Sequence, residues 1–216
     1  MSQEAILNLL KIMSEASIVT IKIFFLTLLF GLPLGLIVSF GRMSKLKFIN
    51  WPIRFYLLIM RGTPLILQLF FFFYFPFYIF NNTLPRFWAA ILAMSINYAA
   101  YFAEIYRSGI ESMPRGQYEA ATVLGFSKSQ TFVKIILPQV VKRILPPMAN
   151  EFMTLVKDTA LVSVIGVSEL YELATDTMSK ASSLIPLIMA GVFYLVMNSI
   201  VSKVCSIAEN KMSYYR

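Results

Sequence analysis

The stretch Glu119–Pro138 reads EAATVLGFSKSQTFVKIILP and is a polar island in an otherwise apolar chain. Its local signals predict two short helices joined at a sharp turn. Gly125 can adopt the left-handed conformation that ends a helix at little steric cost. Ser127 then suits the N-cap of the next helix, with Gln130 three residues later completing a capping box. Apolar residues follow at helical spacing, and Pro138 is expected to end the second helix.

The composition of the chain is that of a membrane protein. Hydrophobic residues make up 58% of the sequence and charged residues only 14%, whereas soluble domains carry roughly 25% charged residues. The sequence has no histidine and one cysteine, Cys205, which excludes histidine-based metal sites, catalytic triads and an internal disulfide. We therefore predict an all-α integral membrane protein without a metal site, in which Cys205 is a small packing residue.

Five segments are apolar enough to cross a bilayer, which takes about 20 helical residues. The whole chain, residues 1–216, is expected to form one transmembrane domain. The predicted spans are residues 18–40, 55–80, 87–106, 148–167 and 184–207, with a polar loop at about 107–146. Pro146 and Pro147 are expected to mark the entry to the fourth span, because proline is well tolerated in a first helical turn.

Lysine and arginine are concentrated on one side of these predicted spans. Most of the 19 basic residues fall in residues 42–54, in the loop 107–146 or in the tail. Since cytoplasmic loops of membrane proteins are enriched in basic residues, this distribution predicts an external N-terminus and a cytoplasmic C-terminus. The same bias explains the net charge of +8 better than a nucleic-acid ligand does.

A polar run interrupts the second predicted span; it consists of Arg61, Gly62, Thr63, Pro64 and, four residues on, Gln68. Pro64 has no backbone N–H, so the carbonyl of Met60, four residues earlier, loses its helical partner. Gly62 permits close approach of another backbone. We expect a broken or kinked helix with exposed dipoles, which transporters use at binding sites.

Polar side chains also line one face of each of the next two predicted spans. In the third span they are Asn97, Tyr101, Glu104 and Ser108. In the fourth span they are Glu151, Thr154 and Asp158, followed by Leu161 and flanked by Lys157. Each set has helical spacing, so its members share a face. Opposed acidic and basic groups in a membrane usually face a cavity or each other, and they can hold the ammonium and carboxylate of a zwitterion.

These polar groups have a plainer interpretation as interhelical hydrogen bonds, which contribute about 1 kcal/mol each in membrane bundles. For Gln68 and Thr154, a structural bond and a ligand contact are equally compatible with the sequence. For Glu104, a structural pair with an arginine such as Arg107 is favoured. For Asp158, which lies deeper in its span, a substrate or gating role is favoured.

The polar stretch resembles the cytoplasmic loop of ABC importer membrane subunits. Every position of that motif is matched, by Glu119, Ala120, Ala121, Gly125, Ile135, Leu137 and Pro138. In that family the loop forms a coupling helix that sits in a groove of the ATP-hydrolysing subunit, so the resemblance implies that these residues couple the chain to an ATPase. The alternative is a surface helical hairpin that has no partner.

The resemblance covers nearly the whole chain. RGTPLILQLFFFFY, NYAAYFAEIYRSGI and KDTALVSVIGV, which begin at residues 61, 97 and 157, are similar to segments of polar amino-acid ABC permeases of the histidine/glutamate/glutamine/arginine/opine group. This resemblance implies a type I importer (MetI-like) permease fold with five transmembrane helices in the bacterial cell membrane. Its implied partners are a second permease subunit, two ATP-binding subunits that hold ATP and Mg, and an extracytoplasmic amino-acid-binding protein or domain.

The chain itself has no GxxxxGK[ST] sequence, so it is expected to bind no cofactor and to be non-catalytic. ATP hydrolysis in the partner is expected to drive amino-acid import by alternating access. The candidate substrate-binding residues are Asn97, Tyr101, Asp158, Arg61, Gly62, Thr63, Gln68, Glu104 and Leu161. Rival interpretations are an ion-coupled secondary amino-acid transporter or channel, which needs no ATPase, and an intramembrane enzyme. Any amino acid, and identical or related paired subunits, are compatible with this sequence.

Overall fold

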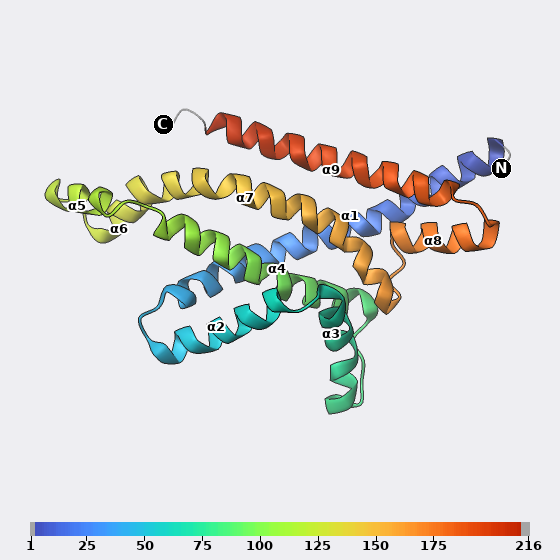
Figure 1. Cartoon of the computed structure of the whole chain (residues 1–216), viewed down its shortest axis with the longest axis horizontal. Helices are drawn as coiled ribbons and strands as arrows, with labels where there is room; N and C mark the ends of the chain where they lie inside the picture. Colours follow the sequence, from blue (N-terminus) through green and yellow to red (C-terminus); the bar gives the residue numbers. More distant parts are fainter. Residues whose placement is uncertain (1–2, 213–216) are drawn as a thin grey trace.

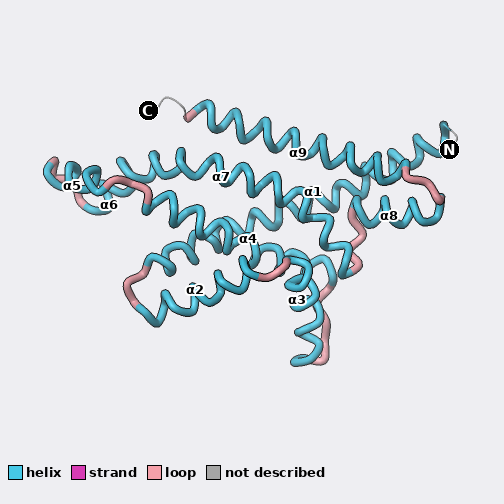
Figure 2. Tube along the Cα trace, viewed as in Figure 1, coloured by secondary structure: helices cyan, strands magenta, loops and turns pink. Residues whose placement is uncertain are grey.

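The computed structural model describes residues 3–212, and this part of the chain contains helices and short connections but no β-strand (Figure 2). The four longest helices are α1 (Gln3–Met43), α4 (Arg86–Glu111), α7 (Leu137–Asp158) and α9 (Ile185–Lys211). The shorter α-helices are α2 (Lys47–Gly62), α3 (Leu65–Phe80), α5 (Arg115–Val123), α6 (Lys128–Thr131) and α8 (Leu170–Ala181). A π-helical turn, Phe132–Ile136, joins α6 to α7, and a 3-10 helix, Thr159–Ile165, follows α7. The predicted all-α fold is confirmed.

The long helices lie side by side, and most connections gather at two opposite ends of the bundle (Figure 1). One end, here called the hairpin end, carries the α1–α2 connection, the α5–α6 hairpin and the end of α9. The other end, the α8 end, carries the start of α1 and α8. Helix α3 projects sideways from the bundle. The basic loops of the sequence therefore share the hairpin end.

Helices α1 and α4 pack along each other through small residues. Gly31 and Gly35 lie one turn apart on α1 and are buried against α4. A Cβ atom on Gly35 would lie 2.8 Å from the Cβ of Phe102 and 3.0 Å from the carbonyl oxygen of Ala99. These distances leave no room for a side chain at Gly35. The two helix backbones therefore approach closely, as they do at small-residue interfaces in membrane proteins.

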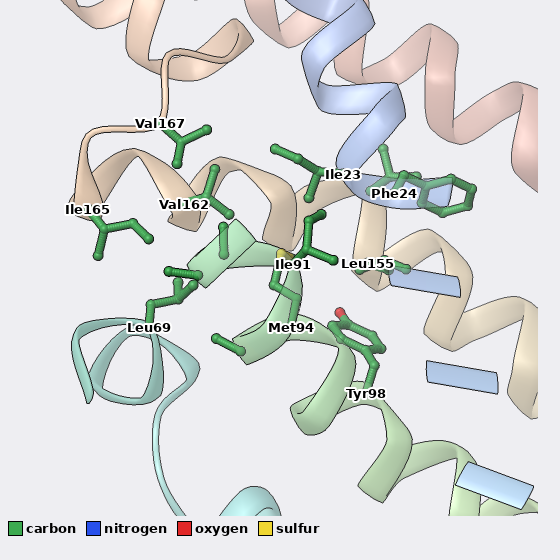
Figure 3. Close-up of a cluster of buried hydrophobic side chains, with 14 of the residues drawn as sticks. Ile23, Phe24, Leu69, Ile91, Met94, Tyr98, Leu155, Val162, Ile165 and Val167 are labelled. Carbon is green, nitrogen blue, oxygen red and sulfur yellow. The ribbon is translucent and has the colours of Figure 1, made fainter. Parts of the chain in front are cut away.

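The main core lies where these two helices meet α3, α7 and the 3-10 helix (Figure 3). Its labelled members include Ile23 and Phe24 of α1, Leu69 of α3, Met94 and Tyr98 of α4, Leu155 of α7 and Val162 of the 3-10 helix. Leu69, Met94, Leu155 and Val162 are completely inaccessible to solvent. This cluster fixes the start of α3 against the middle of α4, which positions the break between α2 and α3.

The predicted second span, residues 55–80, is two helices rather than one. Helix α2 begins at Lys47 and ends at Gly62, and α3 begins at Leu65 and is turned by 114° from α2. Pro64 is the N-cap of α3 and has no N–H to continue the ladder of α2. The predicted break is therefore confirmed, and one crossing by the bent pair stays a prediction.

Two elements at the α8 end were not predicted. Helix α1 begins at Gln3 rather than near residue 18, because its first turns bury Leu9 and Met13 against α8 and α9. The connection expected between the fourth and fifth spans contains α8. Helix α8 has 12 residues, many of them polar, and therefore has no long apolar run.

Glu169 anchors α8 and has no exposed surface. One carboxylate oxygen accepts hydrogen bonds from the N–H groups of Tyr171 (2.8 Å) and Glu172 (3.0 Å). The other accepts from the hydroxyls of Tyr194 (2.8 Å) and Thr20 (3.2 Å). Burial raises the pKa of the Glu169 carboxyl, and the four hydrogen bonds oppose that rise. The side chain thus ties α1, α8 and α9 together.

The prolines near α7 do not act as predicted. Pro138 lies in the first turn of α7 and does not end a helix, since helical backbone continues from Lys128 to Asp158. A π-turn precedes it, in which the N–H of Leu137 bonds to the carbonyl of Phe132, and this wider turn accommodates a residue that has no donor. Pro146 and Pro147 lie inside α7 rather than at its start.

By length and composition, two segments of the described chain can cross a bilayer, Ile6–Met43 and Ile185–Lys211. The bent pair α2–α3 is a third if it counts as one broken span. Helix α4 covers the predicted third span but is not one of these segments. Its sequence includes the polar residues Asn97, Glu104 and Arg107. The five predicted crossings therefore stay a prediction.

The close α1–α4 contact yields a stability prediction. Gly35→Leu places a branched side chain where a Cβ already meets Phe102 and Ala99, so we expect the Tm of the detergent-purified protein to fall by several degrees, as for about 2 kcal/mol of overpacking. Gly191→Leu is the matched control, because a Cβ at Gly191 of α9 has no atom within 4 Å. Equal Tm values for the two variants would contradict the contact.

Candidate functional site

The α2–α3 break is held by two buried side-chain amides. The Nε2 of Gln68 donates to the carbonyl of Met60 (3.0 Å) and to the carbonyl (3.2 Å) and hydroxyl (2.8 Å) of Thr63. The Nδ2 of Asn97, from α4, donates to the same Met60 carbonyl (3.0 Å) and to the Oε1 of Gln68 (2.8 Å). The carbonyl that Pro64 leaves without a partner is thus bonded by side chains from α3 and α4.

This network bears on three residues that the sequence placed at a binding site. Gln68 and Asn97 use their N–H donors on the break, which is the structural alternative considered for Gln68. Gly62 was expected to admit another backbone, but a Cβ atom added to it would have no atom of the described chain within 4 Å. These three residues shape the break, and a substrate contact by any of them stays a prediction.

A line of aromatic rings connects an arginine to an aspartate. The guanidinium carbon of Arg61 lies 5.7 Å from the ring centroid of Tyr101. The rings of Tyr101 and Tyr98 are 6.2 Å apart, and the Tyr98 hydroxyl donates to an Oδ of Asp158 at 2.8 Å. Three predicted residues, Arg61, Tyr101 and Asp158, are therefore brought together across α2, α4 and the end of α7.

Two further residues complete this group, here called the Arg61–Asp158 site. Tyr98 was not predicted, because an aromatic residue in an apolar span looks like core until its hydroxyl partner is known. Glu151, on the Asp158 stripe, is half-buried and lies within electrostatic range of both Arg61 and Asp158. Leu161 packs on the main core, and Thr154 bonds only to the carbonyl of Asn150 in its own helix.

Glu104 lies among three arginines nearer the hairpin end. Both of its oxygens bond to Arg107, at 2.7 Å and 3.2 Å, so the predicted structural pair is confirmed. Arg61 and Arg42 stand farther away, with nitrogen–oxygen distances of 3.7 Å and 3.9 Å. Arg107 also pairs with Glu111 on the next turn. Arg61 thus stands between Glu104 and the Tyr101 ring.

The hairpin of the polar stretch has the predicted local structure. Gly125 has a φ of +80° and follows the end of α5. The Ser127 side chain accepts from the N–H of Gln130, whose own side chain accepts from the N–H of Ser127, which is the predicted capping box. The turn at Gly125 therefore folds the two helices α5 and α6 back on each other.

The predicted coupling residues are divided between exposed and buried positions. Glu119, Ala120, Gly125 and Leu137 are exposed, Ile135 and Pro138 are half-buried, and Ala121 is buried against its own chain. Val123 and Leu124 were not predicted as contact residues, and their side chains are 87% and 73% exposed at the end of α5. Two adjacent apolar residues directly before a helix-ending glycine were the available signal.

Comparisons with known proteins place the chain in a family. The model of the family described as "binding-protein-dependent transport system inner membrane component" matches residues 31–214. The chain belongs to this family. Among curated relatives, the L-cystine transport system permease protein TcyB of Bacillus subtilis (strain 168) is 38% identical over 207 residues, which cover 94% of this chain and 88% of TcyB.

Solved structures agree with this family. An amino acid ABC transporter crystallised with histidines has a chain that is 34% identical, with a TM-score of 0.88 and coverage of 98% of this chain and 99% of that one. The MetNI methionine ABC transporter shares the fold, with a TM-score of 0.75 at 18% identity and coverage of 99% and 100%. The predicted resemblance to amino-acid ABC permeases is confirmed, and the rival classes are not favoured.

The amide network of this permease can be tested by one substitution. Asn97→Leu removes both donors of the amide and leaves the Met60 carbonyl and the Gln68 Oε1 with one partner fewer. We expect a loss of stability of about 1–2 kcal/mol, measured as a lower Tm of the purified protein. Ser108→Ala on the exposed face of α4 is the control, and a Tm equal to that of Ser108→Ala would show that the network does not hold the break.

Proposed function

We propose that this permease is the membrane-spanning subunit of an ABC importer that carries a polar amino acid into the cell. In this proposal the chain crosses the membrane five times, with its N-terminus outside and its C-terminus in the cytoplasm. It pairs with a second permease subunit, two ATP-binding subunits and an extracytoplasmic binding protein or domain. ATP and Mg belong to the ATP-binding subunits, and their hydrolysis cycle drives alternating access.

The observation that carries the proposal is the α5–α6 hairpin at the basic end of the bundle. Its tip presents the apolar side chains of Val123 and Leu124 almost fully to solvent, beside the exposed Glu119 and Ala120. Exposed apolar residues on a water-facing element indicate a protein partner. The resemblance of the motif supports the ATP-hydrolysing subunit as that partner.

The orientation rests on charge and on the arrangement of the helices. Residues 42–54 and 107–146 carry ten of the 19 basic residues. The α1–α2 connection and the hairpin, which belong to these two stretches, lie at the same end of the bundle (Figure 1). The positive-inside bias assigns this end to the cytoplasm. Helices α1, α4, α7 and α9 and the broken pair α2–α3 then supply the five crossings.

The Arg61–Asp158 site is the proposed place of substrate binding. A free amino acid carries a carboxylate and an ammonium group, and this site offers Arg61 at one end and Asp158 with Glu151 at the other. The rings of Tyr98 and Tyr101 lie between the charged ends. Ionisable groups within a membrane bundle cost free energy, so those that are present usually serve a function such as this one.

Purification of the tagged chain from its own membranes tests the function. We expect an ATP-binding-cassette subunit to purify with it, and the reconstituted complex to take up a labelled amino acid when ATP is enclosed on the cytoplasmic side. Uptake driven by an ion gradient without ATP would overturn the proposal, as would a complex whose ATPase attaches elsewhere than at the hairpin.

The hairpin tip yields a coupling prediction. Leu124→Asp places a charge in the proposed apolar contact, so we expect the ATPase subunit to bind at least about tenfold more weakly while the permease still inserts and folds. Co-purification and ATP-dependent uptake are the measurements. Ser129→Asp adds the same charge at an exposed polar position of the hairpin and serves as the control. Wild-type coupling in Leu124→Asp would reject the tip as the contact.

Asp158 yields a substrate prediction. Asp158→Asn keeps an oxygen that accepts from Tyr98 but removes the charge, so the fold survives and the ammonium loses its partner. We expect the KM for uptake to rise about tenfold, with normal assembly. Lys157→Gln, which neutralises the neighbouring exposed charge, is the control. An unchanged KM in Asp158→Asn would remove Asp158 from the site.

A further inference from the structure

A second polar cavity lies between the Arg61–Asp158 site and the hairpin end. It is a groove of about 560 Å³ between the end of α1, α2 and α4. Its lining includes Arg42, Arg54, Arg61 and Glu104, with Leu57 and Leu58. We call it the arginine groove. Its volume exceeds that of any free amino acid, and Arg61 is the one residue of the proposed substrate site among its lining.

The groove lining holds three guanidinium groups and one carboxylate. Its one carboxylate, on Glu104, already bonds through both oxygens to Arg107, which lies outside the groove lining. Arg61 and Arg42 are 3.7 Å and 3.9 Å from that carboxylate, beyond hydrogen-bonding distance. Among residues 3–212, Arg54 has no carboxylate within 4.0 Å. Arg42 donates through Nη1 to the Oδ1 of Asn50 (3.5 Å), so the donors of Arg54 and Arg61 are the ones most available to an anion.

The chemistry of the groove fits a zwitterion better than a simple anion. Guanidinium groups bind a carboxylate through two parallel hydrogen bonds, which Arg54 and Arg61 can supply. Glu104 lies at the same groove and can accept from an ammonium group. Leu57 is buried and Leu58 is exposed, so they offer apolar surface to a side chain. A free amino acid has all three of these groups.

Arg61 is common to both sites. Its guanidinium lies over the Tyr101 ring on one side and faces Glu104 on the other. Lys47, Arg54 and Arg61 are spaced by seven residues, so they form one edge of α2 that runs from the α2–α3 break to the hairpin end. A carboxylate that leaves the Arg61–Asp158 site can thus pass from Arg61 to Arg54 without losing a cationic partner.

We propose that the arginine groove is a second amino-acid site, which receives the transported molecule before its release into the cytoplasm. The proposal rests on the import function argued above. A site on the release path also binds product from the cytoplasmic side. Accumulated amino acid inside the cell will therefore occupy the groove and slow further transport.

The test uses the complete complex in liposomes with ATP inside. The vesicles are preloaded with rising concentrations of unlabelled L-histidine or L-cystine, whichever the wild-type complex imports, and initial uptake of the labelled form is measured. We expect wild-type uptake to fall as the internal amino acid rises. In Arg54→Gln, half-inhibition should need about tenfold more internal amino acid, with an unchanged KM from outside.

Two variants separate the groove from the general charge of α2. Lys47→Gln removes a charge from the same edge of α2 outside the groove, and it should behave as wild type. Arg54→Lys keeps the charge and loses the planar fork, and it should lie between Arg54→Gln and wild type. If Arg54→Gln fails to assemble, Arg54→Lys carries the measurement.

Three outcomes would overturn the inference alone while import itself stands. One is wild-type uptake that internal amino acid does not slow, and another is equal inhibition of wild type and Arg54→Gln. The third is an Arg54→Gln effect that follows the phosphatidylglycerol content of the vesicles and not the internal amino acid, which would assign the groove to a lipid phosphate. A wild-type complex that imports neither probe nor any other amino acid would instead overturn the proposed function.

Discussion

The missing N–H of Pro64 is the constraint on which the centre of this molecule depends. Without it the Met60 carbonyl has no helical partner, and a carbonyl buried in a bundle cannot remain unbonded at low free energy. The chain resolves this by ending α2 at Gly62, turning α3 by 114° and bringing the amides of Gln68 and Asn97 onto that carbonyl. Because Asn97 belongs to α4, the break is fastened to the helix that α1 packs against.

The break also determines where the charges stand. Arg61 is the penultimate residue of α2, so ending the helix there leaves its guanidinium beside Tyr101 and opposite Glu104. Its side chain is 45% exposed, which is high for a cation within an expected span. Arg61 pairs with Glu104 at 3.7 Å and has no hydrogen-bonded carboxylate in the described chain, which leaves its donors available to a mobile carboxylate.

What could be predicted from the sequence was local. Gly125, the Ser127–Gln130 capping box and the break at Pro64 each follow from backbone chemistry within a few residues, and all three are present. Partnerships over long distances were not predictable: the Tyr98 hydroxyl meets Asp158 across 60 positions. Pro138 was misjudged because a π-turn lets helical backbone pass a proline, and that adjustment has no signature in composition.

The continuity of the backbone past Pro138 matters for how force can travel. Helical structure runs unbroken from Lys128 at the hairpin to Asp158. The 22 residues of α7 alone extend about 33 Å. A continuous helix connects its two ends more stiffly than a loop does, although Pro146 and Pro147 each remove one backbone hydrogen bond along the way. Had Pro138 ended the helix, a flexible joint would lie between the hairpin and Asp158. A conformational change requires contacts that differ between two states. In the proposed import cycle, this helix would supply the mechanical link and the charged sites would supply the difference.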